Sequence, residues 1–251
     1  MKAGHLARAL VLTIVLAQMA DAAEIRVLCM PGMRAAMEEL GPQFEGATGH
    51  KLSIRFGTPS QSREALESGA FELVTLDSGV VDDLIKQNKV IRATRAVVGR
   101  MGIGVAVRAG GPKPDITTVE AFKRALLDAR SISYTKDTGA GMYIADLMAR
   151  LGIAEEMKPK TKLMGGGGQN PKAVAAGEVE LGISVIGDIL PVAGVELLGP
   201  LPPELQRYVA VTVGVGTTAR EPEAAKALIR FLTAPTAAPI LKAKGLEPGS
   251  P

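Results

Sequence analysis

Short loops of small and hydroxyl-bearing residues follow several apolar segments of this 251-residue chain. Gly32-Met33, Thr58-Pro59-Ser60-Gln61 and Gly139-Ala140-Gly141 each lead from an apolar segment into one with helical spacing. Backbone N–H groups at the beginning of a helix have no partner within the helix and carry partial positive charge. Residues without bulky side chains let an anion approach them. We therefore predict a small-anion site, although Gly, Ser and Thr are also ordinary caps and turns.

The predicted ligand donors are backbone N–H groups and hydroxyls of these loops. They are Gly32, Met33, Thr58, Ser60, Gln61, Ala140, Gly141 and Tyr143. The Tyr143 hydroxyl either donates to the ligand or projects into water beyond a packed ring. Arg34 and Arg63, just inside their helices, are either solvated charges or the partners that a carboxylate ligand would need.

The composition excludes several classes of function. With 29 Lys and Arg against 26 Asp and Glu, the net charge is only +3, so the basic excess typical of a nucleic-acid binder is absent. Five Phe, three Tyr and no Trp offer few rings for stacking. His5 and His50 are too few for a His-rich zinc site or an obvious Ser-His-Asp triad, and Cys29 cannot form an internal disulfide. We predict no metal, no cofactor and no nucleic-acid partner.

Other potentially reactive groups have simpler explanations, and we assign no catalytic residue. Adjacent acidic pairs such as Asp82-Asp83 face different directions on a helix. The glycines from Gly165 to Gly168 lack the Gly-Lys-Ser/Thr sequence of a P-loop, so nucleotide binding is not expected. His50 follows a turn at the end of a strand remote from the loops, and we expect it on the surface.

The N-terminus has the layout of a secretory signal peptide. Lys2 and Arg8 precede an apolar segment from Ala9 to Ala17, and Ala20-Asp21-Ala22 provides an A-x-A cleavage site. The apolar segment is far shorter than the ~20 residues that span a membrane. We predict that residues 1–22 are removed on export and that the mature protein resides in the periplasm.

The mature chain alternates strand-like and helix-like segments. Strands are expected at 25–30, 52–56, 72–76, 103–108, 131–134, 181–185 and 209–215, and helices at 33–44, 60–69, 79–87, 119–129, 142–151, 169–176, 221–233 and 235–245. The Pro-rich stretch 198–203 is expected to cross between two units. This order predicts an α/β protein with two lobes, each a sheet flanked by helices. Ligands bind beyond the carboxyl ends of parallel strands, which is where the loops fall.

Segments spread over the whole mature chain share the pattern of one protein family. They are the strand 25–30, the helix 34–44, Phe56-Gly57-Thr58-Pro59-Ser60, 64–69, Gly139-Ala140-Gly141-Met142-Tyr143, 177–183 and the helix 224–232. In these segments the chain resembles periplasmic molybdate-binding-type solute-binding proteins of ABC importers, which have the type II periplasmic binding protein fold. The resemblance implies a first lobe of 24–102 plus 207–251, a second lobe of 103–206, a ligand cleft between them, a monomer, and an ABC permease in the inner membrane as partner.

The chain departs from that family at residues that would hold the ligand. The resemblance implies a tetrahedral oxyanion held by neutral donors, but the first serine falls at Gly32, the second near Pro59 and a tyrosine around Val185. The expected function is therefore binding of a small anion, either an oxyanion such as molybdate or a small carboxylate. The alternative is a periplasmic isomerase of a small tricarboxylate, similar to aconitate isomerase, with Asp77 or Tyr143 moving the proton.

Overall fold

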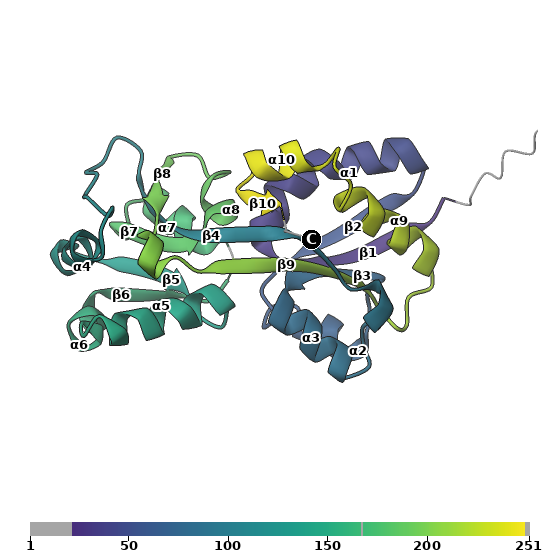
Figure 1. Ribbon diagram of the computed structural model, residues 1–251, viewed down its shortest axis with the longest axis horizontal. Coiled ribbons are helices and arrows are strands. Elements are labelled where there is room, and N and C mark those ends of the chain that lie inside the picture. The colour runs from purple at the N-terminus through teal and green to yellow at the C-terminus, as the bar shows by residue number, and fades with distance from the viewer. Residues whose placement is uncertain (1–21, 167, 249–251) are drawn as a thin grey trace, which may run out of the picture.

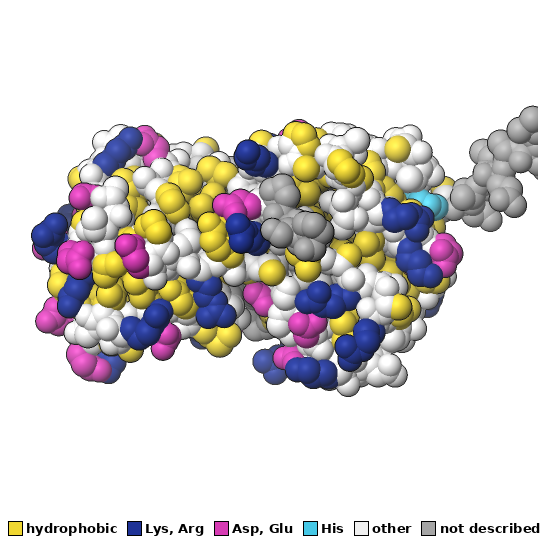
Figure 2. All heavy atoms as spheres, in the orientation of Figure 1, with side chains coloured by type: hydrophobic (Ala, Val, Ile, Leu, Met, Phe, Trp, Pro, Cys, Tyr) yellow, Lys and Arg dark blue, Asp and Glu magenta, His cyan; other side chains and the backbone are white. Residues whose placement is uncertain are grey.

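The computed structural model of the protein describes residues 22–166 and 168–248. The predicted signal peptide lies outside these residues, apart from Ala22. Figure 1 shows two groups of helices and strands, with the long strands β4 (Ala96–Arg108) and β9 (Tyr208–Val215) running between them. Basic and acidic side chains are interspersed over the face of the molecule in Figure 2.

Strands and helices alternate along the described chain. The strands are β1 (Glu24–Cys29), β2 (Lys51–Phe56), β3 (Leu73–Asp77), β4 (Ala96–Arg108), β5 (Ile132–Thr135), β6 (Thr161–Met164), β7 (Leu181–Val185), β8 (Val195–Pro200), β9 (Tyr208–Val215) and β10 (Leu246–Pro248). The α-helices are α1 (Arg34–Thr48), α2 (Arg63–Ser68), α3 (Ser78–Lys86), α4 (Val119–Asp128), α5 (Gly139–Arg150), α6 (Ala154–Met157), α7 (Gln169–Ala175), α8 (Ile186–Ile189), α9 (Pro222–Leu232) and α10 (Ala238–Ala243). Short 3-10 helices are η1 (Pro31–Met33), η2 (Arg92–Thr94), η3 (Lys158–Lys160) and η4 (Pro203–Leu205).

The strands pair in the order β2-β1-β3-β9-β4-β7-β5-β6, with β8 and β10 both pairing with β4. At one end, β1 is parallel to β2 and β3, and at the other, β5 is parallel to β6 and β7. Between these parallel sets, β9 pairs antiparallel with β3 and with β4, and β4 pairs antiparallel with β7. The α/β class predicted from the sequence is confirmed, and a parallel set of strands lies on each side of β4 and β9.

Buried apolar side chains continue from one group to the other. One core cluster joins Val27 of β1, Phe44 of α1, Ile103 of β4 and Ile132 of β5. A separate cluster around Phe71 and Val81 fills the space beneath α2 and α3. β4 contributes side chains to this shared cluster along most of its length. The two groups of helices and strands are therefore connected by a continuous strand that packs into the core.

Three local expectations prove wrong. The stretch expected only as a crossing at 198–203 overlaps β8, which pairs antiparallel with β4. The helix expected to end at Phe44 continues as α1 to Thr48, because Gly49 ends it there in the left-handed region (φ 77°). His50 is buried rather than on the surface, and its Nδ1 accepts a hydrogen bond from the Ala23 N–H at 3.2 Å.

The division into two lobes stays our proposal, and strand pairing supports it. Both β9 and β10 come from the C-terminal part of the chain. β9 pairs with β3 and with the first half of β4, and β10 pairs with the first half of β4. This is the return to the first lobe that the boundaries 24–102 plus 207–251 and 103–206 require. Within the described residues, no helix combines the length and hydropathy needed to cross a lipid bilayer.

Candidate functional site

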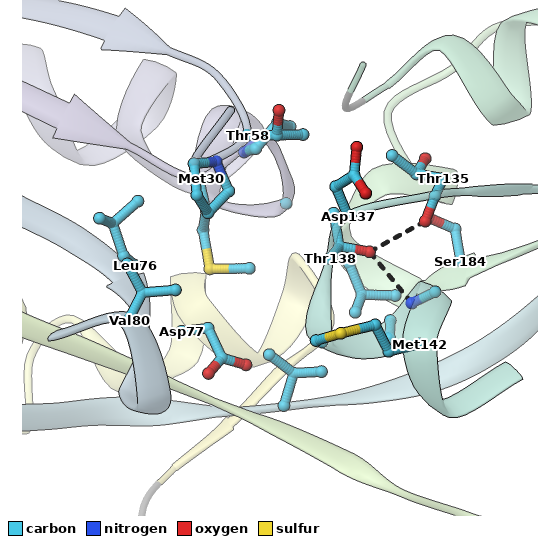
Figure 3. A pocket seen from close by; sticks show the side chains of 18 of the residues that line it. Met30, Thr58, Leu76, Asp77, Val80, Thr135, Asp137, Thr138, Met142 and Ser184 are labelled. Atoms are coloured by element: carbon cyan, nitrogen blue, oxygen red, sulfur yellow. Dashed lines mark hydrogen bonds between the residues drawn. The ribbon is translucent and has the colours of Figure 1, made fainter. Parts of the chain in front are cut away.

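A cavity of about 350 Å³ lies where the two parallel sets of strands end. Its lining comes from the ends of β1, β2, β3, β5 and β7, from the first residues of α3 and α5, and from α8. Figure 3 shows Met30 and Met142 pointing toward each other across the cavity, with Asp77 pointing into it. Carboxyl ends of parallel strands form ligand sites in many α/β proteins. Residues from distant parts of the chain therefore meet at one place here.

Glycines allow the two sides of this cavity to approach each other. A side chain at Gly32 would lie 2.9 Å from Met101 Sδ and 3.1 Å from Val185 Cγ2. A Cβ at Gly187, at the beginning of α8, would overlap the carbonyl oxygen of Gly32. The backbone of η1 therefore lies directly against α8, and a serine at position 32 could not be accommodated without displacing Met101 or Val185.

Helix α5 begins at the cavity and supplies its clearest set of free donors. Thr138 caps the helix by accepting the Gly141 N–H at 3.0 Å, while its own hydroxyl donates to the Thr135 carbonyl. The N–H groups of Gly139 and Ala140, in the first turn, have no carbonyl within the helix to bond with. A Cβ at Gly141 would overlap the Thr135 carbonyl oxygen, so only glycine allows this tight entry into the helix. The first turn of α5, which lines the cavity, therefore contains N–H groups that have no partner among the described residues.

The loop after β2 uses many of its polar groups internally. Gln61 Oε1 accepts from the Thr58 N–H at 3.0 Å and from the Thr58 hydroxyl at 3.3 Å. The Thr58 and Ser60 hydroxyls are also 3.0 Å apart. Thr58 lines the cavity, whereas Ser60 and Gln61 lie outside its lining. The Gln61 amide instead reaches across to Gly166, where a Cβ would be 2.5 Å from Nε2. Gly166 thus packs against this loop.

Half of the predicted donors line the cavity and half do not. Gly32, Thr58, Ala140 and Gly141 belong to the lining. Outside it are Met33, Ser60, Gln61 and Tyr143, of which Met33 is fully buried. The Tyr143 hydroxyl donates to the Leu205 carbonyl at 2.6 Å, and its ring lines an adjoining groove instead.

The two candidate arginines also lie outside the cavity lining. The Arg34 guanidinium lies 4.0 Å from the centre of the Phe56 ring and 3.7 Å from Glu38. Arg63 is an exposed residue at the first position of α2. In this arrangement, neither guanidinium forms part of the wall that a carboxylate ligand in the cavity would contact.

The charged side chains of the described cavity lining are carboxylates. They are Asp77, Asp83, Asp137 and Asp188. Asp77 Oδ1 accepts the Gly79 N–H at 2.8 Å as the cap of α3, and Oδ2 lies 3.0 Å from where a Cβ of Gly139 would be. Asp137 adopts a left-handed conformation (φ 59°) in the turn before α5. The cavity therefore combines neutral hydrogen-bond donors with negatively charged hydrogen-bond acceptors.

Sequence reasoning missed Thr135, Ser184 and Asp188 on the cavity wall. Thr135 is the last residue of β5 and Ser184 the next to last of β7. The rule that ligands bind beyond strand ends would have selected both, had it been applied to every strand rather than to the glycine-rich loops. Asp188 gave no local signal, because only the fold brings α8 to the cavity. Among the described residues, no group of three His, Cys, Asp or Glu side chains could hold a metal ion.

Comparison with known proteins decides the family. A model of the family described as "Bacterial extracellular solute-binding protein" matches residues 25–247. This chain belongs to that family. The match covers both groups of elements and every strand that lines the cavity.

The relatives of this solute-binding protein include binders and an enzyme. It is 29% identical over 231 residues to an aconitate isomerase from Pseudomonas sp., covering 89% of this chain and 87% of the relative. It is 27% identical over 240 residues to the molybdate-binding protein ModA of Azotobacter vinelandii, covering 92% of both chains. The predicted resemblance to molybdate-binding-type proteins is thereby confirmed.

A solved structure shows the same fold. The periplasmic molybdate-binding protein of Azotobacter vinelandii superposes with a TM-score of 0.77 at 18% identity, covering 90% of this chain and 100% of that one. The type II periplasmic binding protein fold predicted from the sequence is confirmed. An identity this low says nothing about the ligand, since one fold carries many functions.

Proposed function

We propose that this protein is the extracytoplasmic solute-binding component of an ABC importer and binds a small anion in the cavity between its two halves. The observation that carries the proposal is the beginning of α5, where the free N–H groups of Gly139 and Ala140 meet residues from both parallel sets of strands. Such donors and the helix dipole favour negative charge. The family membership supports the same role.

The proposed ligand is a small oxyanion or a small carboxylate with few charges. Neutral donors can hold one anionic group, as the N–H groups of α5 would do here. A second or third carboxylate would need a cation, and Arg34 and Arg63 lie outside the cavity lining. The carboxylates Asp77 and Asp137 on the described lining would also repel further negative charge.

Location and partners form part of this proposal. The predicted signal peptide would deliver the protein to the periplasm, where it would act as a monomer and pass its ligand to an inner-membrane ABC permease. Ligand binding would bring the two halves together, because each half supplies part of the cavity lining.

The test begins with a thermal-shift screen of oxyanions and small carboxylates on the mature protein. Hits are then titrated by calorimetry against Gly139→Pro and its control Gly139→Ala. Both variants add a Cβ at the same place, but only proline removes the N–H, which the first turn of a helix tolerates. Thr138 before it is already extended (φ −124°, ψ 155°), as a residue before proline should be.

The expected result is at least about a tenfold weaker affinity for Gly139→Pro than for Gly139→Ala, the usual effect of one hydrogen bond to a charged group. Equal affinities would show that the anion is not held at the beginning of α5. A screen without any hit among oxyanions and carboxylates would remove the small-anion proposal itself.

A second candidate function is isomerisation of a small tricarboxylate, and the relative named aconitate isomerase is the observation that favours it. Asp77 would take a proton from the carbon beside a carboxylate while the double bond moves. It would then return the proton to the other end of the allylic system. Incubation with cis- or trans-aconitate, followed by chromatography, distinguishes the two functions. Turnover that Asp77→Asn abolishes would establish the enzyme, whereas thermal stabilisation without turnover supports the binder.

A further inference from the structure

Asp188 lines the cavity, and only one of its two carboxylate oxygens has a hydrogen-bond partner among the described residues. Its Oδ2 accepts a hydrogen bond from the Ser184 hydroxyl at 2.9 Å. Its Oδ1 is buried and has no hydrogen-bond partner among the described residues, although the residue as a whole is partly exposed. A buried acceptor without a donor is costly, so this oxygen is suited to receive a donor from a bound ligand.

No cation contacts this carboxylate among the described residues. Arg34, from the beginning of α1, is the positive group that acts on it, but that guanidinium lies against Phe56 and Glu38. The other charged side chains of the described cavity lining are Asp77, Asp83 and Asp137, which are also negative. Burial consequently raises the pKa of Asp188 to about 6, against the weaker opposing effects of Ser184 and Arg34.

Thr135 is a second cavity residue with a buried polar atom that lacks a hydrogen-bond partner among the described residues. It is 6% exposed, it lines the cavity, and its Oγ1 has no hydrogen-bond partner in the described part of the chain. Thr135 and Ser184 lie on the same side of the cavity in Figure 3, at the ends of the neighbouring strands β5 and β7. A threonine hydroxyl can both donate and accept, whereas an ionised aspartate only accepts.

We propose that Asp188 and Thr135 make the cavity selective for an anion that itself donates a hydrogen bond, through a hydroxyl or a protonated acid group. This inference rests on the proposed function, since it takes the cavity to be the ligand site. The N–H groups of α5 donate hydrogen bonds to the negative group of the ligand. Asp188 Oδ1 accepts a hydrogen bond from the hydroxyl of the ligand.

Fully deprotonated oxyanions present only acceptors to this wall. Their oxygens would face the unpaired carboxylate oxygen without a proton between them, and the repulsion is strong where water is excluded. Hydrogen phosphate and hydroxycarboxylates both carry the required donor. Molybdate, tungstate and sulfate at neutral pH do not, so the wall discriminates against them.

The experiment compares ligands that differ in one donor. Calorimetry at pH 7.5 measures phosphate against sulfate and lactate against propionate on the mature protein. The first pair tests oxyanions and the second tests carboxylates. In at least one pair, the donor-bearing member should bind about tenfold or more tightly, as expected for a hydrogen bond to a charged acceptor. If sulfate and propionate bind as tightly as phosphate and lactate, the inference is overturned.

Variants assign the preference to Asp188. Asp188→Asn keeps the shape but adds an amide donor, so the affinity ratio should fall to about threefold or less, or reverse. Thr135→Val should lower the affinity for the donor-bearing ligand in the same pair and serves if Asp188→Asn does not fold. Asp83→Asn is the matched control, because Asp83 also lines the cavity but is exposed and paired with Lys86 at 2.8 Å. An unchanged ratio in Asp188→Asn, or an equal loss in Asp83→Asn, contradicts the inference.

These outcomes separate this inference from the proposed function. One outcome is that a ligand binds more weakly to Gly139→Pro while its affinity ratio stays the same in Asp188→Asn and Thr135→Val. In that case the cavity is the ligand site and only the inference about selectivity is wrong. If none of the four ligands nor any screened anion binds, both proposals fall together.

Discussion

Glu72 and Asp188 both have buried carboxylate oxygens, but Glu72 precedes a strand and Asp188 follows one. The two carboxylates also differ in how many hydrogen bonds they accept. Glu72, just before β3, is 2% exposed and accepts three hydrogen bonds from Arg26, at 2.9 Å from its N–H, 2.8 Å from Nε and 2.7 Å from Nη2. Asp188, beyond the end of β7, lines the cavity and accepts one hydrogen bond, and its buried Oδ1 has no partner among the described residues. The first group is complete without a ligand, whereas the second is not.

The surroundings move the two pKa values in opposite directions. Burial alone would raise the pKa of Glu72, but the hydrogen bonds and charge of Arg26 outweigh it and hold that pKa below its usual value. For Asp188, burial dominates and the pKa rises to about 6. A carboxylate at the amino end of a strand thus stabilises the fold here, while the one at the carboxyl end costs stability and is available for binding.

The largest expected effect comes from breaking the paired site. Arg26→Ala should lower the free energy of unfolding by about 3 kcal/mol, because the buried Glu72 carboxylate loses its cation and keeps, of the three hydrogen bonds from residue 26, only that from the backbone N–H. Urea unfolding at pH 7 measures the change. Arg95→Ala is the control, since its ion pair with Asp82 is largely exposed and should contribute less than about 1 kcal/mol. A loss for Arg26→Ala as small as that of the control would refute the structural role of the pair.

The unpaired site should respond to pH in the opposite sense. The folded-state pKa of Asp188 lies above the ordinary value of 3.8, at about 6. Its protonation therefore favours the fold fully below pH ~4, and this stabilisation is lost as the pH rises to about 6. Relative to Asp188→Asn, the wild type should lose roughly 2 kcal/mol of unfolding free energy between pH 4 and pH 7. Parallel stability curves for the two proteins would contradict the raised pKa.

Removing the Ser184 hydroxyl, the one donor to Asp188 in the described part of the chain, should sharpen the contrast. Ser184→Ala deletes the hydroxyl that stabilises the ionised form, so the pKa of Asp188 should move further above about 6. The unfolding free energy at pH 7 should fall by about 1 kcal/mol. Carbon-detected NMR titration follows the carboxyl directly. Ser68→Ala, whose hydroxyl donates only to backbone carbonyls, should leave this titration unchanged.

The smallest expected effect comes from comparing the hydroxyls of Thr75 and Thr135, both without a partner among the described residues. Thr75 lies in the core and Thr135 lines the cavity. The Thr75 Oγ1 is fully buried in β3, has no partner among the described residues, and lies outside the cavity lining. Thr75→Val should stabilise the protein by about 0.5–1 kcal/mol without changing ligand affinity, since a methyl group needs no partner. Thr135→Val should weaken binding instead. Thermal unfolding with calorimetry compares them, and a loss of affinity in Thr75→Val would break the distinction.

The sequence by itself determined the alternating elements and the general position of the site. Apolar periodicity identified the parallel strands β1, β2, β3, β5 and β7 close to their observed bounds, because period and turn residues are local properties. It missed β8, whose short segment is stabilised by pairing with β4 rather than by its own pattern. It also placed His50 on the surface, since the Ala23 and Phe44 contacts that bury its ring come from other segments.

Within the site, the sequence selected Gly32, Thr58, Ala140 and Gly141, because glycine-rich and hydroxyl-rich loops between a strand and a helix are visible in the order of residues. Only the tertiary structure decided how those donors are used. It gave the Thr58 N–H to Gln61, and it turned the Tyr143 hydroxyl toward the Leu205 carbonyl. It also brought Asp188 to the cavity, with one oxygen that no group in the described part of the chain pairs. Whether a polar atom is satisfied depends on what other segments place within about 3 Å of it, and no local pattern of residues contains that information.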